Sequence, residues 1–330
     1  MSITSLLHSA PWFLPARIIL ALNYRVITQL RNLFYELGIF KTYSVKTPVI
    51  SVGNISVGGS GKTILVQALV EHFLSLNQKP AVLSRGYGRS SKGLVLVCDG
   101  KTSKATYSEA GDEPFMIAQN FPEIAIVVSE NRLVGAEYLH DNFSPDVIIL
   151  DDGFQHRRLH RDLDILILDF QLSQKNHLLP WGYLRETLDG MNRANHIIYS
   201  KDGIQDGSQN NLVLTLENRV QDHQNRPFDL SELNGDYGLF AGLGKPEHFF
   251  NSVEEIHGPS SIKISFPDHA EYNQKQRDII SSHSCNYWIT TQKDYIKLSP
   301  GFCEQNRVYF IQVKSSLPKV LEQHLKHSFN

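Results

Sequence analysis

Short apolar runs recur along most of the chain, and segments with helical spacing lie between several of them. The runs typical of buried strands are residues 49–52, 80–84, 94–98, 124–128, 146–150, 163–168 and 197–200. Residues 64–73, 111–119 and 132–139 instead carry apolar side chains at the steps of a helix. Strands buried on both faces that alternate with helices are typical of a mainly parallel, doubly wound sheet. The pattern therefore predicts an α/β domain of this kind.

A polar, turn-rich segment at residues 202–211 separates this pattern from a second one. Beyond it, apolar β-runs recur at residues 213–216, 239–241, 262–265, 287–290 and 308–313. Helical patterns separate several of these runs, and the polar segment has the composition of a joint between domains. We therefore predict one domain at 47–203 and a second, smaller α/β domain at 204–330.

The first 46 residues form a third region, in which the apolar positions follow a single helical stripe. The stripe consists of Ile19, Leu22, Val26, Leu30, Leu33 and Leu37. Glu36 is the only acidic residue here, against five basic ones (Arg17, Arg25, Arg31, Lys41 and Lys46). A basic amphipathic helix suits an anionic membrane surface, although a helix packed on the protein's own core would show the same stripe. We expect residues 1–46 to contact a membrane without spanning it.

Composition narrows the class of protein further. A formal net charge of −2 gives no general reason to expect a nucleic-acid partner. Cys98, Cys285 and Cys303 lie far apart without metal or redox spacing, so we expect reduced thiols in the cytosol. The start of the chain has no pattern of a secretory signal. We expect a monomer.

The strongest chemical pattern is a glycine-rich loop between a strand and a helix. It comprises Ser56, Val57, Gly58, Gly59, Ser60, Gly61, Lys62 and Thr63. In a phosphate-binding loop the backbone N–H groups cradle the phosphates, the lysine reaches the β- and γ-phosphates, and the hydroxyl binds Mg²⁺. Ser56 stands where the usual pattern has glycine, and the alternative is a Gly/Ser hinge that precedes a lysine. The strand–loop–helix setting predicts a nucleoside triphosphate site.

Carboxylates in two places could complete a magnesium site. Asp151 and Asp152 end the predicted strand at 146–150, and a carboxylate at such a strand end holds Mg²⁺ in phosphate-loop enzymes. Glu186 is a second candidate, which could equally be an ordinary surface carboxylate. We predict that Thr63, Asp151 and Glu186 form the metal shell.

Arginines gather near the predicted strand ends, where a doubly wound sheet binds its ligands. They are Arg85, Arg89, Arg132, Arg157, Arg158 and Arg185. Any one of them could be a surface charge, but together they suit a phosphorylated second substrate because guanidinium groups bind phosphate bidentately.

Asp112 and His269 are candidates for acid–base chemistry. Asp112 begins a predicted helix, so it could simply cap that helix, and a lone histidine at a strand end is usually structural. An Asp–His pair would nevertheless give a kinase a base with a better-matched pKa than aspartate alone. Sequence cannot show that the two residues meet.

Several motifs together resemble the tetraacyldisaccharide 4'-kinase (lipid A 4'-kinase) family over nearly the whole chain. In addition to the loop they are residues 84–89 (SRGYGR), 111–114 (GDEP), 150–156 (LDDGFQH), 179–186 (LPWGYLRE), 240–244 (FAGLG), 266–269 (FPDH) and 291–294 (TQKD). The DDGFQH run and the Asp-His motif are highly specific together.

The resemblance implies transfer of the ATP γ-phosphate to the 4'-hydroxyl of a tetraacylated glucosamine disaccharide 1-phosphate, at the cytoplasmic face of a Gram-negative inner membrane. It implies that Lys62 and Thr63 bind phosphate and Mg²⁺ and that Asp151 binds the metal. It also implies that Asp112 and His269 form a catalytic dyad. Glu186 matches a family position that lines the active site. So do the residues that we expect to bind substrate, which are Arg85, Tyr87, Arg132, Gln155 and Arg185. It also implies that the smaller domain closes over the site.

Two other classes of phosphate-loop protein carry a loop of this kind. A membrane-positioning ATPase often carries an early lysine in the loop, where this chain has Ser56, Val57 and Gly58. A GTPase metallochaperone would need a guanine-reading Asn-Lys-x-Asp motif and a Cys/His cluster, and the sequence has neither. Nucleotide competition and stimulation of turnover by a glycolipid would separate these classes from a kinase.

Overall fold

Eight strands form the larger sheet, in the order β3-β4-β2-β5-β1-β6-β7-β8. The computed structural model describes residues 14–58, 61–169, 177–200, 210–224 and 226–329. Only β3 runs antiparallel to its neighbour. The strands are β1 (Val49–Gly53), β2 (Pro80–Ser84), β3 (Val95–Asp99), β4 (Ala125–Val128), β5 (Val147–Asp151), β6 (Leu163–Asp169), β7 (His196–Ser200) and β8 (Asn211–Leu212). Every predicted strand of the first domain is present, within a residue or so at its ends.

Helices cover both faces of this sheet, because successive side chains of each strand point to opposite sides. Ile50 and Val52 of β1 pack with α3 (Lys62–Ser75) and α5 (Asp112–Asn120) in one apolar cluster. Val49 belongs to a second cluster with α6 (Arg132–Phe143). Two short helices, α4 (Tyr107–Ala110) and η3 (Leu188–Arg193), lie between these elements. The doubly wound α/β fold predicted from the sequence is confirmed.

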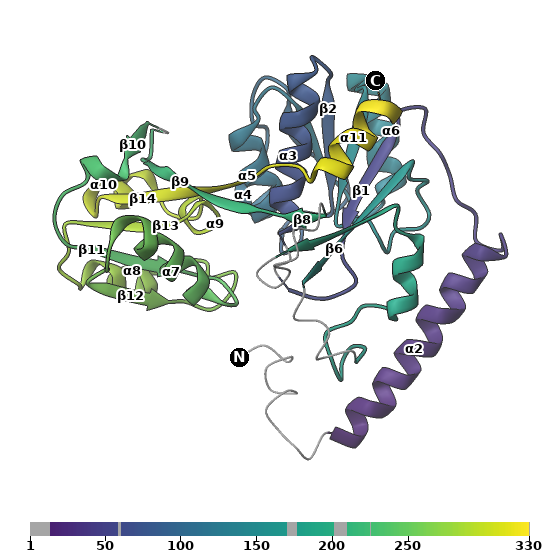
Figure 1. Ribbon diagram of the computed structural model, residues 1–330, viewed down its shortest axis with the longest axis horizontal. Helices are drawn as coiled ribbons and strands as arrows, with labels where there is room; N and C mark the ends of the chain where they lie inside the picture. Colours follow the sequence, from purple (N-terminus) through teal and green to yellow (C-terminus); the bar gives the residue numbers. More distant parts are fainter. Residues whose placement is uncertain (1–13, 59–60, 170–176, 201–209, 225, 330) are drawn as a thin grey trace.

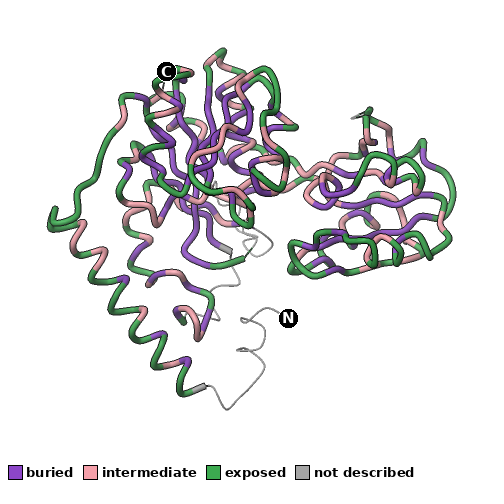
Figure 2. Tube along the Cα trace, turned by 180° about the vertical axis from the view of Figure 1, so that it is seen from behind, coloured by how far each residue is buried: buried purple, intermediate pink, exposed green. Residues whose placement is uncertain are grey.

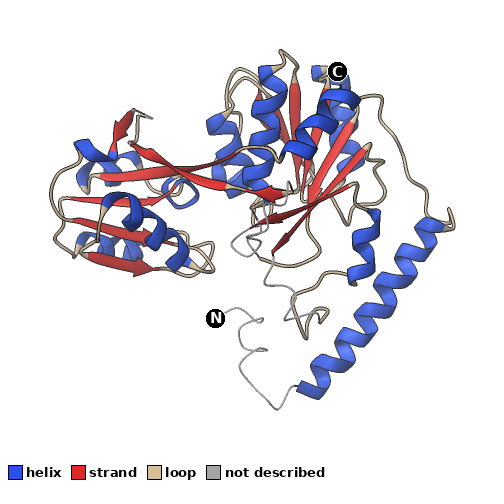
Figure 3. Cartoon of the chain, viewed as in Figure 1, coloured by secondary structure: helices blue, strands red, loops and turns tan. Residues whose placement is uncertain are grey.

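The second sheet has six strands in the order β10-β9-β14-β13-β11-β12. The last four are parallel, whereas β9 and β10 are antiparallel additions. The strands are β9 (Leu214–Gln221), β10 (Pro227–Asp229), β11 (Tyr237–Ala241), β12 (Ile262–Ser265), β13 (Tyr287–Thr291) and β14 (Val308–Ser315), and η4 (Leu230–Glu232) follows β10. The helices of this lobe are α7 (Pro246–His257), α8 (Gln274–Ser281), α9 (Gln292–Tyr295) and α10 (Pro300–Gln305). It is the second α/β unit that the sequence predicts (Figure 3).

Two long strands connect the lobes. Figure 1 shows β9 and β14 running side by side from the second lobe to the first, where β14 is followed by α11 (Lys319–Ser328). Leu321 and Leu325 of α11 belong to the apolar cluster of the first lobe. The C-terminal helix therefore packs on the first lobe, although the predicted second domain runs to residue 330. Most of the predicted joint lies at residues 201–209, outside the described residues.

The N-terminal helix α2 (Leu14–Glu36) stands out from the first lobe (Figure 1). Its predicted apolar stripe faces away from the protein: Leu22 is 55% exposed, Val26 53% and Leu37 64%. Figure 2 shows the same row of exposed residues along the helix. Its inward face is more polar, with Arg17 and Thr28 buried. The stripe is thus not used to pack the helix on the protein's core.

Candidate active site

The phosphate-binding loop follows β1, whose last residue, Gly53, is packed closely against Phe154. A Cβ atom on Gly53 would lie 2.6 Å from Cβ of Phe154, so the strand end tolerates only glycine. Val57 N–H then donates to the carbonyl of Tyr183 at 2.8 Å, and Arg185 N–H donates to the carbonyl of Ile55 at 2.7 Å. The segment around residues 183–185 therefore pairs with the start of the loop. Gly59 and Ser60 lie outside the described residues.

At the other end of the loop, Gly61 has φ of 83° and caps α3, which begins at Lys62 and continues with Thr63. The Lys62 ammonium lies 3.7 Å from Asp152 Oδ1, and the same carboxylate accepts hydrogen bonds from Arg185 at 2.8 and 2.9 Å. Burial raises the pKa of Asp152, but Lys62 and Arg185 outweigh it and hold that pKa below its ordinary value. Asp152 also has φ of 54°, a conformation that non-glycine residues adopt rarely outside functional sites and turns.

Asp151 is buried at the end of β5, between β1 and β2. Its Oδ2 accepts a hydrogen bond from the Ser84 hydroxyl at 3.0 Å, and its buried Oδ1 has no partner among the described residues. Burial, with the nearby charges of Glu113 and Asp152, raises the pKa of Asp151 to about 7. A buried carboxylate with one free oxygen is therefore poised to accept a cation.

The donor set around Asp151 fits Mg²⁺, which takes one or two carboxylates and completes its shell with water and phosphate oxygens. Within the described ranges no three His, Cys, Asp or Glu residues are grouped closely enough to hold a metal alone. Glu186 is engaged elsewhere: its buried carboxylate accepts hydrogen bonds from Arg193 at 2.7 Å and Gln155 at 3.0 Å. Its role as a metal ligand stays a prediction and would require it to leave these donors.

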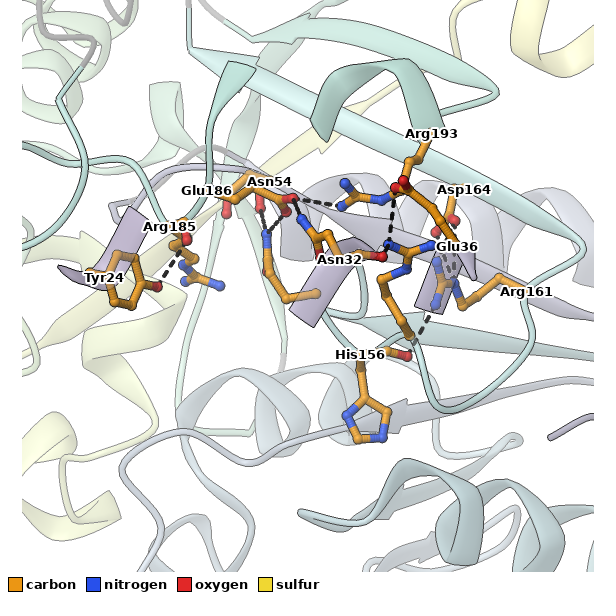
Figure 4. Close-up of polar contacts among 12 residues, drawn as sticks. Tyr24, Asn32, Glu36, Asn54, His156, Arg161, Asp164, Arg185, Glu186 and Arg193 are labelled. Atoms are coloured by element: carbon orange, nitrogen blue, oxygen red, sulfur yellow. Dashed lines mark hydrogen bonds and ion pairs between the residues drawn. The ribbon is translucent and has the colours of Figure 1, made fainter. Parts of the chain in front are cut away.

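Figure 4 shows how α2 joins this network. Asn32 Nδ2 donates to Glu186 at 3.4 Å, and the Tyr24 hydroxyl donates to the backbone carbonyl of Arg185 at 2.8 Å. Arg17 donates to the carbonyl of Trp181 at 3.1 Å. The polar face of α2 therefore holds residues 181–186, the segment that pairs with the phosphate loop.

The predicted substrate residues divide into two groups. Arg85 and Tyr87 are exposed, on the loop after β2. Arg132 is almost fully buried at the start of α6, where burial lowers its pKa to about 10, so it remains a cation at neutral pH. Gln155 donates to the Asn54 carbonyl at 2.7 Å and braces the loop.

Three of the six arginines singled out from the sequence contact side chains that are not among the predicted site residues. Arg89 pairs with Glu130 at 2.5 Å, and Arg157 pairs with Glu36 on α2 at 3.6 Å. Arg158 stacks over the ring of Tyr43. These three are structural charges in the described protein, whereas Arg185 contacts Asp152 beside Lys62.

Asp112 and His269 meet, although they come from different lobes. His269 Nδ1 lies 3.2 Å from Asp112 Oδ2. Gly111, with φ of 89°, places the start of α5 against the loop after β2: a Cβ atom there would lie 2.9 Å from the Tyr87 carbonyl. The Tyr87 ring in turn lies 5.8 Å from that of His269. Asp112 is the first residue of α5 and Gly111 occupies the N-cap position, so Asp112 is not the cap of this helix.

Two lysines of the second lobe complete this arrangement. Lys297 Nζ lies 2.8 Å from Asp112 Oδ2, and Lys293 Nζ lies 3.4 Å from His269 Nε2. Burial raises the pKa of Asp112, but the contacts with His269, Lys297 and Lys293 outweigh it and leave the pKa lower than usual. An ionised carboxylate only accepts hydrogen bonds, so His269 Nδ1 carries the proton and Nε2 presents its lone pair.

The sequence pattern named Asp152 at the strand end without assigning it a site role, and it did not point to Lys297. Asp152 follows the expected ligand Asp151 directly, and which of the two faces Lys62 depends on the turn after β5. Lys297 follows the TQKD motif by three residues, so its position beside a motif was the available signal. Nothing local indicates that it faces Asp112 in the other lobe.

A glycine-rich loop between a central parallel strand and a helix, with a buried carboxylate at the end of the next strand, defines a phosphate-loop nucleotide-binding protein.

Comparison with known proteins names the family. Residues 14–330 match the Tetraacyldisaccharide-1-P 4'-kinase family (LpxK). The tetraacyldisaccharide 4'-kinase of Chlorobium limicola is 38% identical over 83% of this chain and 84% of its own. That of Geobacter metallireducens is 35% identical over 92% and 95%. The crystal structure of the "apo" form of LpxK from Aquifex aeolicus in complex with ATP superposes with a TM-score of 0.80, at 31% identity, over 100% of both chains.

The chain therefore belongs to the tetraacyldisaccharide 4'-kinase family and is a kinase. This confirms the resemblance identified from the motifs, as well as the fold class predicted from the apolar pattern.

Proposed function

We propose that this chain transfers the γ-phosphate of ATP to the 4'-hydroxyl of a tetraacylated glucosamine disaccharide 1-phosphate in lipid A biosynthesis. The observation that carries the proposal is the meeting of Asp112 and His269 at 3.2 Å beside a phosphate-binding loop. Family membership supports the choice of donor and acceptor.

The triphosphate would lie in the loop formed by residues 56–63. Lys62 binds the β- and γ-phosphates, and the backbone N–H groups of the loop bind the remaining oxygens. Thr63 and Asp151 would hold Mg²⁺, with Glu186 as a further ligand; when bound, the ion neutralises charge on the transferring phosphoryl group. The Asp152 carboxylate contacts both Lys62 and Arg185 and so keeps these two cations close together near the γ-phosphate.

The acceptor would bind where exposed and buried cations meet. Arg85, Arg132 and Arg185 are cations suited to phosphate groups, and Tyr87 offers a flat, 75%-exposed ring beside His269. Gln155 supports the site through its hydrogen bond to the loop backbone.

The acceptor hydroxyl would be activated by the dyad. His269 donates Nδ1–H to Asp112, which orients the ring and stabilises the imidazolium that forms, while Nε2 takes the hydroxyl proton. In a loose transition state for phosphoryl transfer the base positions the nucleophile and removes its proton late, so a full alkoxide is not required.

We also propose that the division into regions 1–46, 47–203 and 204–330 has a functional meaning. His269 reaches Asp112 only if the second lobe docks on the first. Docking therefore completes the dyad and excludes water that would otherwise hydrolyse ATP.

Residues 1–46 would bind the cytoplasmic face of the inner membrane peripherally. The exposed apolar stripe of α2 supports this, since an acylated acceptor stays in the bilayer. Within the described part of the chain, no helix is long and apolar enough to cross a membrane.

The test is incubation with γ-labelled ATP and the disaccharide 1-phosphate, followed by lipid extraction. We expect label in the extracted glycolipid, and none with Lys62→Ala or when the acceptor is omitted. Label appearing only as inorganic phosphate, at a rate that the glycolipid does not change, would support an ATPase instead. An excess of unlabelled GTP should not compete.

A further inference from the structure

A lysine with a fully buried side chain contacts Asp112 of the dyad and the backbone of the residue that follows His269. Lys297 lies in the turn after α9, and its side chain is 0% exposed. Its ammonium contacts Asp112 Oδ2 at 2.8 Å and donates to the backbone carbonyl of Ala270 at 3.0 Å. Ala270 directly follows His269 in the chain. A buried ammonium is costly unless it is paired, so these two partners account for its position.

We propose that Lys297 is a positioning residue for phosphoryl transfer: it keeps Asp112 ionised and oriented toward His269, and it ties the His269 loop to the first lobe. The proposal deepens the kinase function proposed above and rests on it. The Lys297 side chain is shielded from solvent, and it is not itself a proton carrier in this role.

The geometry supports an orienting role. Lys297 Nζ and His269 Nδ1 both contact the same carboxylate oxygen, Oδ2 of Asp112. Two donors on one oxygen hold the carboxylate in a single rotamer, and the link to Ala270 sets the distance between the His269 loop and α5. His269 has φ of 58°, so its loop adopts a backbone conformation that needs such support.

Charge supports the same role. The groups that act on Asp112 are His269, Lys293 and Lys297 from the second lobe. Asp268 lies beside His269, Glu113 follows Asp112 on its own helix, and burial together with Asp112 and a nearby glutamate raises the pKa of Tyr107 on α4. Burial works against the ionised carboxylate, and Lys297 provides both a hydrogen bond and a positive charge in its favour. Without Lys297, burial would still raise the pKa of Asp112, and only His269 and Lys293 among these groups would lower it.

The first experiment compares Lys297→Met with wild type. Methionine nearly preserves the volume of the side chain but removes its charge. We expect kcat to fall roughly 10- to 100-fold, as for residues that orient a catalytic group, with KM for ATP nearly unchanged. Lys263→Met is the matched control, because it removes an exposed lysine of the same lobe from its pair with Glu254. Wild-type kcat in Lys297→Met would overturn the proposal.

A second readout separates positioning from general support of the fold. The acidic limb of the kcat–pH profile should move to higher pH in Lys297→Met, because Asp112 must then ionise without the ammonium. In an Asp112→Asn background, Lys297→Met should cost less than about twofold, since a neutral amide does not need the charge. An unmoved limb, or the full loss in the Asn background, would assign Lys297 a merely structural role.

A third readout does not depend on catalysis, so failure of the kinase assay and failure of this proposal remain distinguishable. The pKa of Asp112 is lower in the folded protein than in the unfolded chain. The ionised carboxylate therefore stabilises the fold at pH values above its unfolded pKa, and this stabilisation is lost as pH falls through its folded pKa. The gap in free energy of unfolding between wild type and Lys297→Met should therefore narrow as pH falls through this window. A gap that is constant with pH would overturn the ion pair's role.

Discussion

The phosphate-binding loop and the Asp112–His269 dyad are two halves of one reaction site with opposite construction. The loop comes from one short stretch of chain, between β1 and α3, and its supports belong to the same lobe. The dyad comes from α5 in the first lobe and from the loop after β12 in the second. The first half is therefore present whenever the first lobe folds, whereas the second exists only when the lobes dock.

The contrast extends to electrostatics. On the loop side, burial raises the pKa of Asp151. Among the described residues one of its oxygens has no partner, and the other accepts a hydrogen bond only from a serine hydroxyl. On the dyad side, lysines and a histidine lower the pKa of Asp112. Asp151 has no cationic partner in contact within the described part of the chain and is suited to binding a metal ion. Asp112 is already paired with cationic side chains and is suited to orienting a base.

The largest effect should follow a change in the loop. Lys62→Ala removes the charge that meets the transferring phosphoryl group, so we expect kcat to fall by about 10³-fold or more. Circular dichroism should show an unchanged fold, because Lys62 is at the first turn of α3 and its ion pair with Asp152 is partly exposed. Near-normal transfer by this variant would remove the loop from the reaction.

The dyad should respond as one unit. Asp112→Ala and His269→Ala should each lower kcat by roughly 10²–10⁴-fold, the usual contribution of a general base, with little change in KM for ATP. The double variant should be much less impaired than the product of the single losses. A cycle with strictly multiplicative losses would show that the two residues act independently.

Falling pH should impair the loop side before the dyad side. Asp151 must be ionised to bind Mg²⁺, so the KM for Mg²⁺ should rise, by up to about tenfold per pH unit, once pH falls below about 7. The contribution of Asp112 to kcat should persist to pH values below the ordinary range of aspartate, because its pKa is lowered. Asp151→Asn should abolish the pH dependence of the KM for Mg²⁺. If kcat fell over the same pH range in which the KM for Mg²⁺ rises, the proposed difference between Asp151 and Asp112 would be wrong.

A smaller effect is expected where the lobes touch away from the chemistry. Asn120 on α5 and Gln292 on α9 exchange hydrogen bonds of 2.6 and 3.1 Å. Gln292→Ala should lower kcat by about tenfold, the value of one or two hydrogen bonds, without changing ATP binding. Gln274→Ala, which removes an exposed amide of α8, is the control. An equal loss in ATP affinity would mean that the loop also depends on docking.

The smallest effect should come from α2, which is remote from the dyad. Arg25 is exposed, whereas Arg17 is buried against residues 180–181, so Arg25 is the better probe of membrane contact. Arg25→Gln should weaken binding to anionic vesicles by about 1 kcal/mol, roughly fivefold, at low salt. Co-sedimentation measures this, with neutral vesicles as the control. Unchanged binding to anionic vesicles would argue against a role for this face.

Much of the fold was predictable because its information is local. Apolar runs bounded by turns identify most strands of both sheets, although they miss the short β8 and β10 and the second half of β9. The loop sequence identifies the phosphate site, since its function depends on backbone N–H groups in one contiguous turn. The stripe on α2 was equally visible in the sequence. Its exposure was not, because an amphipathic helix looks the same whether it faces a core or a membrane.

The sequence by itself determined the fold class, the loop and the identity of the motifs, because each depends on neighbours along the chain. Tertiary structure alone decided that α11 returns to the first lobe, that Asp152 rather than Asp151 meets Lys62, and that Glu186 lies among donors. It also decided that Lys297 and His269 converge on one oxygen of Asp112. Some of these contacts join the two lobes and the others join distant segments of the first lobe. Their formation depends on how helices and sheets pack, which no local pattern records.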